Sequence, residues 1–174
     1  MRTIENRSKG LIKFVDAYRD YTSIPKPKFG LIKIDELFDH ISKLLKGEFR
    51  ELGIDFNINI RFDKLEITAD RELIEMVLIN LLKNSKEALL DSEGAKIDLT
   101  ASLDEDRHVI LEVKDNGPGI IPEALDRIFI PFYTTKKSGS GIGLALSRQI
   151  MQLHQGTLSV KSEPNIFTIF SLRF

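Results

Sequence analysis

Two glycine clusters and a pair of asparagines contain the residues of this chain whose types and spacing suit chemistry. Residues 115–120 read Asp-Asn-Gly-Pro-Gly-Ile, and residues 139–144 read Gly-Ser-Gly-Ile-Gly-Leu. Glycines let a backbone approach a ligand closely, and Asp115 can accept hydrogen bonds from an exocyclic amine. Asn80 and Asn84 are four residues apart, so they share one face of a helix. The second glycine cluster opens a helix, whose free amides bind anions. Together these residues predict a nucleotide pocket.

Each feature also has a structural interpretation. Residues 115–120 form a good turn sequence, and the asparagine pair can cap a neighbouring loop. Residues 139–144 lack the Lys-Ser/Thr ending of a P-loop and do not follow a strand as a dinucleotide fingerprint does. A buried amide without a partner costs about 1–3 kcal/mol, so Asn80 and Asn84 need a ligand, a hydrated ion or a strand end. The order and spacing of all three elements favour the nucleotide pocket.

Hydrophobic periodicity predicts the elements that position these residues. The predicted strands are residues 54–62, 65–68, 95–103, 107–114, 156–162 and 166–173. The predicted helices are residues 35–46, 70–90 with Asp70 as N-cap, and 141–154. Residues 121–138 are mostly irregular. Because strands outnumber crossover helices, the predicted fold class is α+β: a two-layer sandwich with a mixed, mostly antiparallel sheet and helices on one face.

Composition bounds the functional class. A hydrophobic content of 42% supports a buried core, and 25 basic against 26 acidic residues leave a net charge of −1. This charge gives no whole-chain attraction to nucleic acid or to an anionic membrane, so neither is expected as a partner. The chain has no cysteine, no apolar run of membrane-spanning length and no signal-peptide core, so a cytoplasmic location is expected.

The N-terminal 25 residues are predicted to form a separate unit. Ile4, Leu11 and Tyr18 are seven residues apart, with Val15 between them, which predicts an amphipathic helix with a heptad-like seam. The helix ends near the prolines of residues 24–27. It either folds back on the main core or belongs to a helical bundle or dimer.

Four segments together resemble the ATP-binding catalytic domain of sensor histidine kinases, of the ATPase superfamily shared with gyrase, a heat-shock chaperone and mismatch-repair proteins. Residues 78–84 resemble its N box and residues 115–120 its first glycine box. Residues 129–136 resemble its F box and residues 139–144 its second glycine box. The resemblance covers residues 30–174, and implies the two-layer Bergerat-type ATP-binding fold.

The resemblance implies roles for single residues. Asp115 would bind the adenine amino group, Asn84 would coordinate Mg²⁺, and Asn80 would support the phosphate side, so that Asn80, Asn84 and Lys136 are the candidate catalytic residues. The further nucleotide-binding candidates are Gly117, Gly119, Ile120, Phe132, Thr135, Lys136, Gly139, Ser140, Gly141, Ile142, Gly143 and Leu144. Residues 121–138 would be a mobile ATP lid with Phe129 and Phe132 as apolar latches, and Lys137 or Arg127 as weaker phosphate-facing cations. Glu87 stands where many members have a basic residue, which leaves the role of Lys86 open.

The implied function is donation of the ATP γ-phosphoryl group to a histidine outside the chain. Water-activating superfamily members have a glutamate at the position of Asn80, and an amide cannot act as a general base near neutral pH. None of His40, His108 and His154 is followed by an acidic residue as an acceptor histidine is, so residues 1–25 are expected to be the second helix of the dimerisation and phosphotransfer domain plus its linker. Residues 26–174 are the expected catalytic domain.

The implied cofactors are ATP and Mg²⁺. The implied partners are the phosphotransfer domain of the same protein, in cis or trans, a response regulator, and a second copy in a full-length homodimer that can be membrane-anchored. An ATP-hydrolysing clamp and a non-enzymatic ATP-sensing domain are the alternatives.

Overall fold

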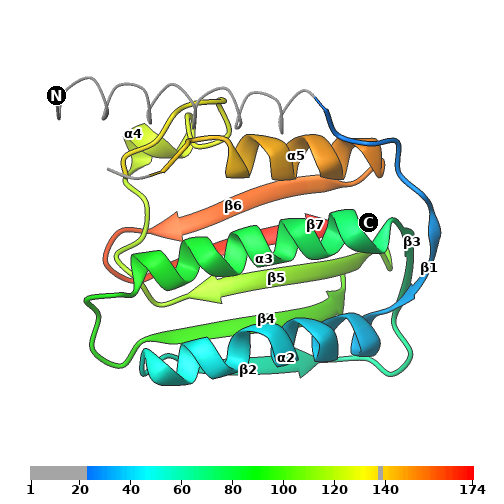
Figure 1. Cartoon of the computed structure of the whole chain (residues 1–174), viewed down its shortest axis with the longest axis horizontal. Helices are drawn as coiled ribbons and strands as arrows, with labels where there is room; N and C mark the ends of the chain where they lie inside the picture. Colours follow the sequence, from blue (N-terminus) through cyan, green and yellow to red (C-terminus); the bar gives the residue numbers. More distant parts are fainter. Residues whose placement is uncertain (1–22, 137–138) are drawn as a thin grey trace, which may run out of the picture.

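The computed structural model describes residues 23–136 and 139–174 (Figure 1). Its strands are β1 (Gly30–Lys33), β2 (Asp55–Ile60), β3 (Glu66–Ala69), β4 (Lys96–Leu103), β5 (Val109–Asp115), β6 (Thr157–Glu163) and β7 (Phe167–Arg173). Its helices are α2 (Ile34–Glu51), α3 (Arg71–Ala88), the short α4 (Pro122–Leu125) and α5 (Gly143–Leu153).

Five strands form one mixed sheet in the order β2-β4-β5-β7-β6. The β2–β4 pair is parallel, and the other three pairs are antiparallel. Strands β1 and β3 form a separate small antiparallel sheet. Helices α2, α3 and α5 lie together on one face of the large sheet (Figure 1). The predicted two-layer α+β architecture is therefore confirmed.

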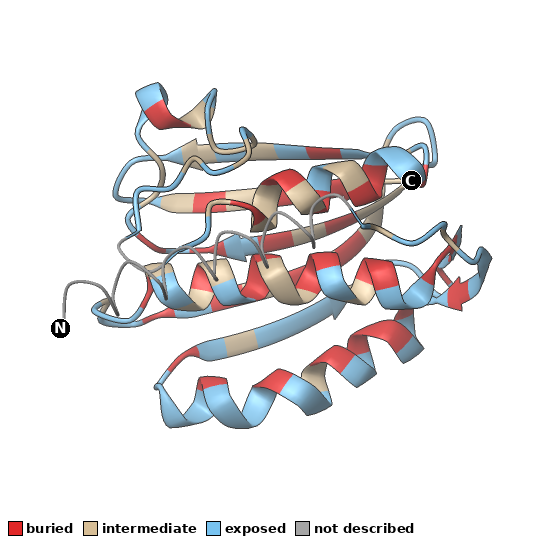
Figure 2. Ribbon diagram, turned by 45° about the horizontal axis from the view of Figure 1, so that its top comes forward, coloured by how far each residue is buried: buried red, intermediate tan, exposed pale blue. Residues whose placement is uncertain are grey.

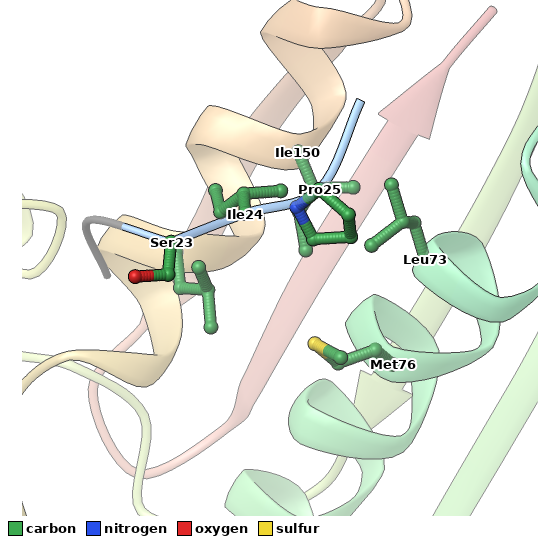
Figure 3. A pocket seen from close by; sticks show the side chains of 7 residues that line it. Ser23, Ile24, Pro25, Leu73, Met76 and Ile150 are labelled. Atoms are coloured by element: carbon green, nitrogen blue, oxygen red, sulfur yellow. The ribbon is translucent and has the colours of Figure 1, made fainter. Parts of the chain in front are cut away.

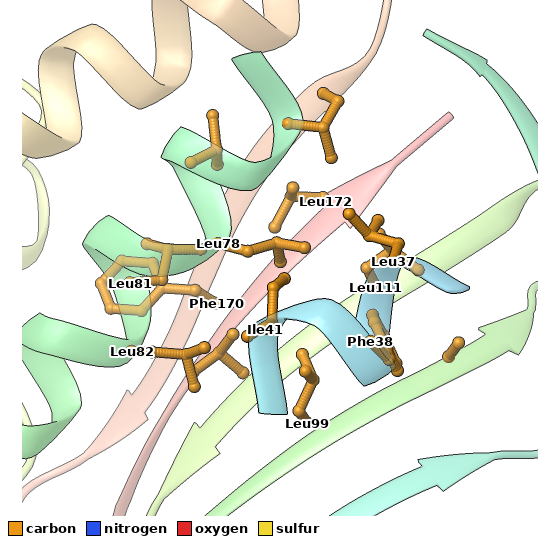
Figure 4. Packing of buried hydrophobic residues seen from close by; sticks show 14 of the residues in the cluster. Leu37, Phe38, Ile41, Leu78, Leu81, Leu82, Leu99, Leu111, Phe170 and Leu172 are labelled. Carbon is orange, nitrogen blue, oxygen red and sulfur yellow. The ribbon is translucent and has the colours of Figure 1, made fainter. Parts of the chain in front are cut away.

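Apolar side chains fill the layer between the helices and the sheet. Leu78, Leu81 and Leu82 of α3 are fully buried against strand residues such as Leu99 and Leu111 (Figure 4). Along the helices, buried positions alternate with exposed ones, as expected for helices packed on one side (Figure 2). Each large apolar side chain in this layer contributes about 1.5–3 kcal/mol, so the layer fixes how α3 lies on the sheet.

Asp70 begins α3 and joins it to two other parts of the chain. Its Oδ1 accepts a hydrogen bond from Leu73 N at 3.2 Å, which is an N-cap, as predicted. Its Oδ2 accepts one from Lys28 N at 2.7 Å. Its own backbone N donates to Nε2 of the buried His154, the C-cap of α5, at 3.0 Å. One residue therefore connects the segment before β1, α3 and the end of α5.

Some element boundaries differ from the prediction. Helix α2 runs to Glu51, beyond residues 35–46, because Phe49 still packs in the core. The sequence does not predict β1, since only Ile32 of its four residues is buried and no alternation is visible. Strand β3 pairs with β1 and not with β2, its neighbour in sequence. Helix α4 lies in the segment predicted to be mostly irregular, with Pro122 in its first turn.

Two further points concern the predicted N-terminal helix and membrane-spanning helices. The predicted N-terminal helix of residues 4–21 lies outside them. Within residues 23–136 and 139–174, every helix is too short or too polar to cross a bilayer.

Candidate functional site

Asp115 is a buried carboxylate at the end of β5. It is 3% exposed and stands between Ile97 of β4 and Thr168 of β7 in the sheet. Ser85 Oγ donates a hydrogen bond to its Oδ2 at 2.8 Å, and Gly117 N donates to its Oδ1 at 3.0 Å. Burial raises the pKa of the Asp115 carboxyl above its usual range, while these two hydrogen bonds act in the opposite direction. Each oxygen keeps a lone pair that can accept from a ligand amine.

The loop after Asp115 is fixed at both ends. Asn116 Oδ1 accepts from Lys96 N at 2.7 Å and Asn116 Nδ2 donates to Gly94 O at 2.9 Å, which holds the loop on the start of β4. Gly119 has a φ of +68°, and a Cβ there would lie 2.4 Å from Glu163 O. Both facts require glycine at position 119, as the close approach predicted for this cluster demands.

The same loop is hydrogen-bonded to β6 and β7. Ile120 N donates to Ser162 Oγ at 2.8 Å, and Ser162 Oγ donates its one proton to Phe167 O at 2.8 Å. Thr168 Oγ1 lies 3.1 Å from Ser162 Oγ and is therefore the donor of that contact. These bonds connect the first glycine cluster to Thr168, the sheet neighbour of Asp115.

Asn80 lies half-buried between α3 and α5. Its Nδ2 donates a hydrogen bond to Oγ of the buried Ser147 at 3.0 Å. A Cβ on Gly143 would lie 2.4 Å from Asn80 Oδ1. Gly143 therefore permits the close approach of the two helices, and the Asn80 amide ties α3 to the first turns of α5.

Asn84, one turn further along α3, is in contact with a cationic side chain. Lys136 Nζ donates to Asn84 Oδ1 at 3.2 Å and lies 2.6 Å from Glu87 Oε2. The predicted phosphate-facing cation thus reaches the predicted metal-binding amide. The Asn84 amide oxygen thus already accepts a hydrogen bond from a cation at the protein surface. It therefore suits magnesium, which takes oxygen ligands and keeps several waters and phosphate oxygens in its coordination shell.

The second glycine cluster leads into α5, which begins at Gly143. Gly141 has a φ of +69°, a Cβ there would lie 2.6 Å from the Phe132 carbonyl carbon, and Phe132 N donates to Gly141 O at 2.9 Å. Ile142 is buried, and its N–H lies 3.4 Å from Ser140 Oγ. Among the described residues no side chain caps α5, so its first amides are available to an anion.

The other predicted lid residues divide into packed and exposed ones. Phe129 is half-buried, with the Arg148 guanidinium 5.2 Å from its ring. Phe132 is 39% exposed. The Arg127 guanidinium lies 4.6 Å from the centre of the Tyr133 ring. This weaker candidate for a phosphate-facing cation therefore contacts another residue of the predicted lid.

The remaining candidates lie at or near the surface. Thr135, Gly139 and Ser140 are exposed, and the Thr134 side chain approaches both Lys136 and Gly139. Leu144 is half-buried and packs against the core. Lys137 lies outside the described residues.

Three polar residues to which the sequence interpretation gives no role in the site contact its members. Ser85 bonds Asp115, Ser147 bonds Asn80, and Glu87 bonds Lys136. For two of them the sequence held a usable signal, because Ser85 follows Asn84 directly and Glu87 is three residues after it on the same helix. Their partners are 30, 67 and 49 residues away in sequence, so the contacts themselves had no local signature.

The three histidines are engaged elsewhere. His154 is buried, with Nδ1 2.7 Å from Ile150 O and Nε2 bonded to Asp70 N. His40 lies 3.7 Å from Glu75. His108 clusters with Asp104 and Asp106 at the other side of the sheet's hairpin, where Arg173 pairs with both carboxylates. Because Arg173 already occupies both carboxylates, the cluster is an ion-pair network rather than a metal site.

A cavity of about 410 Å³ lies between the segment before β1 and helices α3 and α5 (Figure 3). Ile24 and Pro25 line it from that segment, Leu73 from α3 and Ile150 from α5. None of the described residues that line it is charged, and Asp115, Asn84 and Lys136 are not among them. It is therefore unsuited to phosphate and distinct from the polar site.

Comparison with known proteins gives a consistent family. Residues 69–174 match the family model described as "Histidine kinase-, DNA gyrase B-, and HSP90-like ATPase". Sporulation kinase A of Bacillus subtilis (strain 168) is 34% identical over 155 residues, covering 87% of this chain and 25% of that protein. The chain thus spans about a quarter of the length of this relative.

Solved structures agree with this match. The catalytic domain of the histidine kinase ThkA, in a nucleotide-free form, superposes with a TM-score of 0.76 at 33% identity, covering 84% of this chain and 95% of that chain. ThkA in complex with the response regulator TrrA gives a TM-score of 0.76 at 30% identity, covering 98% of this chain and 49% of that chain.

Proposed function

Because the chain belongs to the histidine kinase-, DNA gyrase B- and HSP90-like ATPase family as a histidine kinase ATP-binding catalytic domain, we propose that its residues transfer the γ-phosphoryl group of ATP to a histidine of a separate phosphotransfer domain. One observation carries the assignment of the site. The buried Asp115 carboxylate and the amide of Asn84 are joined through Ser85, which follows Asn84 and bonds Asp115. A base-recognising acid and a metal-binding amide are thereby held at a fixed separation on one helix and one strand end.

Asp115 recognises the adenine amino group. Its two oxygens are oriented by Ser85 and Gly117, so their remaining lone pairs point in fixed directions. Gly117 and Gly119 have no side chains that would obstruct the adenine base, and Ile120 follows them in the same loop. A carboxylate fixed in advance loses little freedom on binding, which favours affinity.

The phosphates lie toward the start of α5. Residues 139–144 bring its uncapped amides to the site, and Lys136 supplies a positive charge. Asn84 would hold Mg²⁺, which supplies charge neutralisation of the phosphates when bound. Asn80 keeps the start of α5 against α3 through Ser147 and so positions the phosphate end.

Transfer is favoured over hydrolysis. A hydrolase needs a base that activates water, and the residue one turn before Asn84 is the amide Asn80, whose Nδ2 is already bonded to Ser147. Phosphoryl transfer needs mainly positioning and charge neutralisation, both of which this site can supply.

The whole protein is larger in this proposal. Residues 1–25 are the second helix of a dimerisation and phosphotransfer domain followed by a linker, and residues 26–174 are the catalytic domain. The full-length protein is a cytoplasmic or membrane-anchored homodimer, and it passes its phosphoryl group to a response regulator. The ThkA–TrrA complex supports a partner of that class.

Calorimetric titration with ATP, with and without Mg²⁺, tests the site. Asp115→Asn should weaken ATP binding at least about tenfold, because a hydrogen bond to a charged group contributes about 1.5–3 kcal/mol. Asp98→Asn is the matched control: Asp98 pairs with Lys96 and follows the buried Ile97, so it lies on the opposite sheet face. Equal affinities of both variants would refute the adenine assignment.

Incubation with γ-labelled ATP tests the reaction. Label should remain in ATP when the chain is alone, and should move to histidine when the separately produced phosphotransfer domain of the same protein is added. Steady release of phosphate by the chain alone would instead identify a hydrolase. Tight ATP binding without transfer to that domain would identify an ATP-sensing domain.

A further inference from the structure

Lys136 contacts two oxygens of α3 with one ammonium group. Its Nζ lies 3.2 Å from Asn84 Oδ1 and 2.6 Å from Glu87 Oε2. Asn84 and Glu87 are three residues apart on the helix, so their side chains are neighbours on its surface. The lysine reaches them from a segment 52 and 49 residues further along the chain. The structure thus presents an amide oxygen and a carboxylate oxygen converging on a single cation.

We propose that Asn84 and Glu87 form one cation site, which the Lys136 ammonium fills when no metal is bound and from which a divalent cation displaces it. The proposal rests on the proposed function only in taking Asn84 as the metal-binding residue. Glu87 is then a further residue for magnesium binding, and Lys136 is its internal competitor.

The chemistry of the two oxygens supports this assignment. Amide and carboxylate oxygens are the ligands that Mg²⁺ and Mn²⁺ prefer. The same oxygens cannot hold an ammonium and a divalent ion together, because two like charges a few ångströms apart repel each other. Binding of the metal therefore requires Lys136 to leave.

The strength of the existing contact permits that exchange. The side chains of Lys136 and Glu87 are 40% and 49% exposed, and exposed ion pairs contribute little to stability. A divalent ion accompanied by nucleotide phosphates can therefore displace the lysine. The released Lys136 ammonium is then available to bind the nucleotide phosphates, which replace Glu87 as its negatively charged partner.

A neighbouring ion pair supplies the matched control. Lys86 is also on α3, and its Nζ lies 2.8 Å from Glu48 of α2. Lys86→Met removes one positive charge next to Glu87 in sequence but leaves the contacts of Lys136 in place. If the net charge of the chain alone governed metal binding, Lys86→Met and Lys136→Met would change it equally.

The test is a titration of the whole chain with Mn²⁺ without nucleotide, followed by electron paramagnetic resonance. Lys136→Met should bind Mn²⁺ roughly fivefold more tightly than the parent, the scale expected for removing a unit charge close to a divalent ion at an exposed site. Lys86→Met should bind as the parent does. Adding Glu87→Gln or Asn84→Ala to Lys136→Met should abolish the gain.

Two results would overturn the proposal. One is Lys136→Met binding Mn²⁺ no more tightly than Lys86→Met, and the other is Lys136→Met/Glu87→Gln binding as tightly as Lys136→Met. Lys136→Gln, which removes the same charge, serves if Lys136→Met does not fold by circular dichroism. Because nucleotide is absent, a parent chain that failed to bind ATP would refute the proposed function without deciding this one.

Discussion

Asn80 and Ser147 are 67 residues apart in sequence and are joined by a hydrogen bond of 3.0 Å from Asn80 Nδ2 to Ser147 Oγ. The bond links the middle of α3 to α5, and the same Asn80 side chain lies against Gly143, which lets the two helices approach. The start of α5, where phosphates are proposed to bind, therefore depends on a polar contact made one turn into that helix.

Ser147→Ala should lower both stability and nucleotide affinity. It leaves the half-buried Asn80 amide without its acceptor, at a cost of about 1–3 kcal/mol in the free energy of unfolding. It should also weaken ATP binding, because α5 is then less firmly placed. Urea unfolding and calorimetric titration measure the two effects. Ser159→Ala, on the exposed side of β6, should change neither. Unchanged ATP affinity in Ser147→Ala would separate this contact from the phosphate site.

Asp115→Asn should lose ATP binding while gaining stability at neutral pH. Burial raises the pKa of the Asp115 carboxyl in the folded state, so the unfolded chain releases this proton first as the pH rises. The free energy of unfolding of the parent therefore falls as the pH rises from the ordinary carboxyl pKa through the raised one. The variant lacks this loss and can still bond Ser85 and Gly117.

Thermal unfolding of parent and variant across the acid range checks this sign. The stability advantage of Asp115→Asn should disappear below the ordinary carboxyl pKa, where both folded and unfolded parent are protonated. An advantage that grew toward acid would contradict a raised pKa.

Asp70→Ala should destabilise the chain by about 1–2 kcal/mol, through loss of the helix cap. Partial burial works against ionisation, but the N–H groups of Lys28, Leu73 and Glu72 together hold the pKa of Asp70 below its usual range. The stabilisation is therefore present above the ordinary carboxyl pKa and is lost as the pH falls through the lowered one. Asp70→Asn keeps one oxygen to cap Leu73 N but turns its NH2 group toward Lys28 N, so in a urea titration it should lose less stability than Asp70→Ala but not none. Equal loss in both variants would exclude capping as the cause.

Gly119→Ala should destabilise strongly, whereas Gly47→Ala should not. Position 119 combines a φ of +68° with a carbonyl 2.4 Å from the new Cβ, and backbone cannot move aside as a side chain does. Left-handed geometry alone costs an alanine about 1–2 kcal/mol. Gly47 lies inside α2 with open space around it, where alanine stabilises a helix by up to about 1 kcal/mol. Opposite shifts in melting temperature are expected, and equal shifts would contradict the role of Gly119.

Local patterns were sufficient for much of the fold and site. Alternation gave the strands of the large sheet, and Asp70 gave the start of α3, because strand faces and helix caps depend on residues close in sequence. The two glycine clusters indicated close backbone approach, and the structure shows it at Gly119, Gly141 and Gly143. The short β1 was not predicted, because four residues with one buried side chain show no alternation of apolar and polar positions.

The sequence by itself determined the family, the fold class and which residues form the two glycine clusters and the asparagine pair, since motif order and periodicity are properties of neighbouring residues. Only the tertiary structure decided the partners: Ser85 on Asp115, Ser147 on Asn80, and Lys136 between Asn84 and Glu87. Each of these contacts joins elements far apart in the chain. Their geometry follows from how helices pack on a shared sheet, which no single segment encodes.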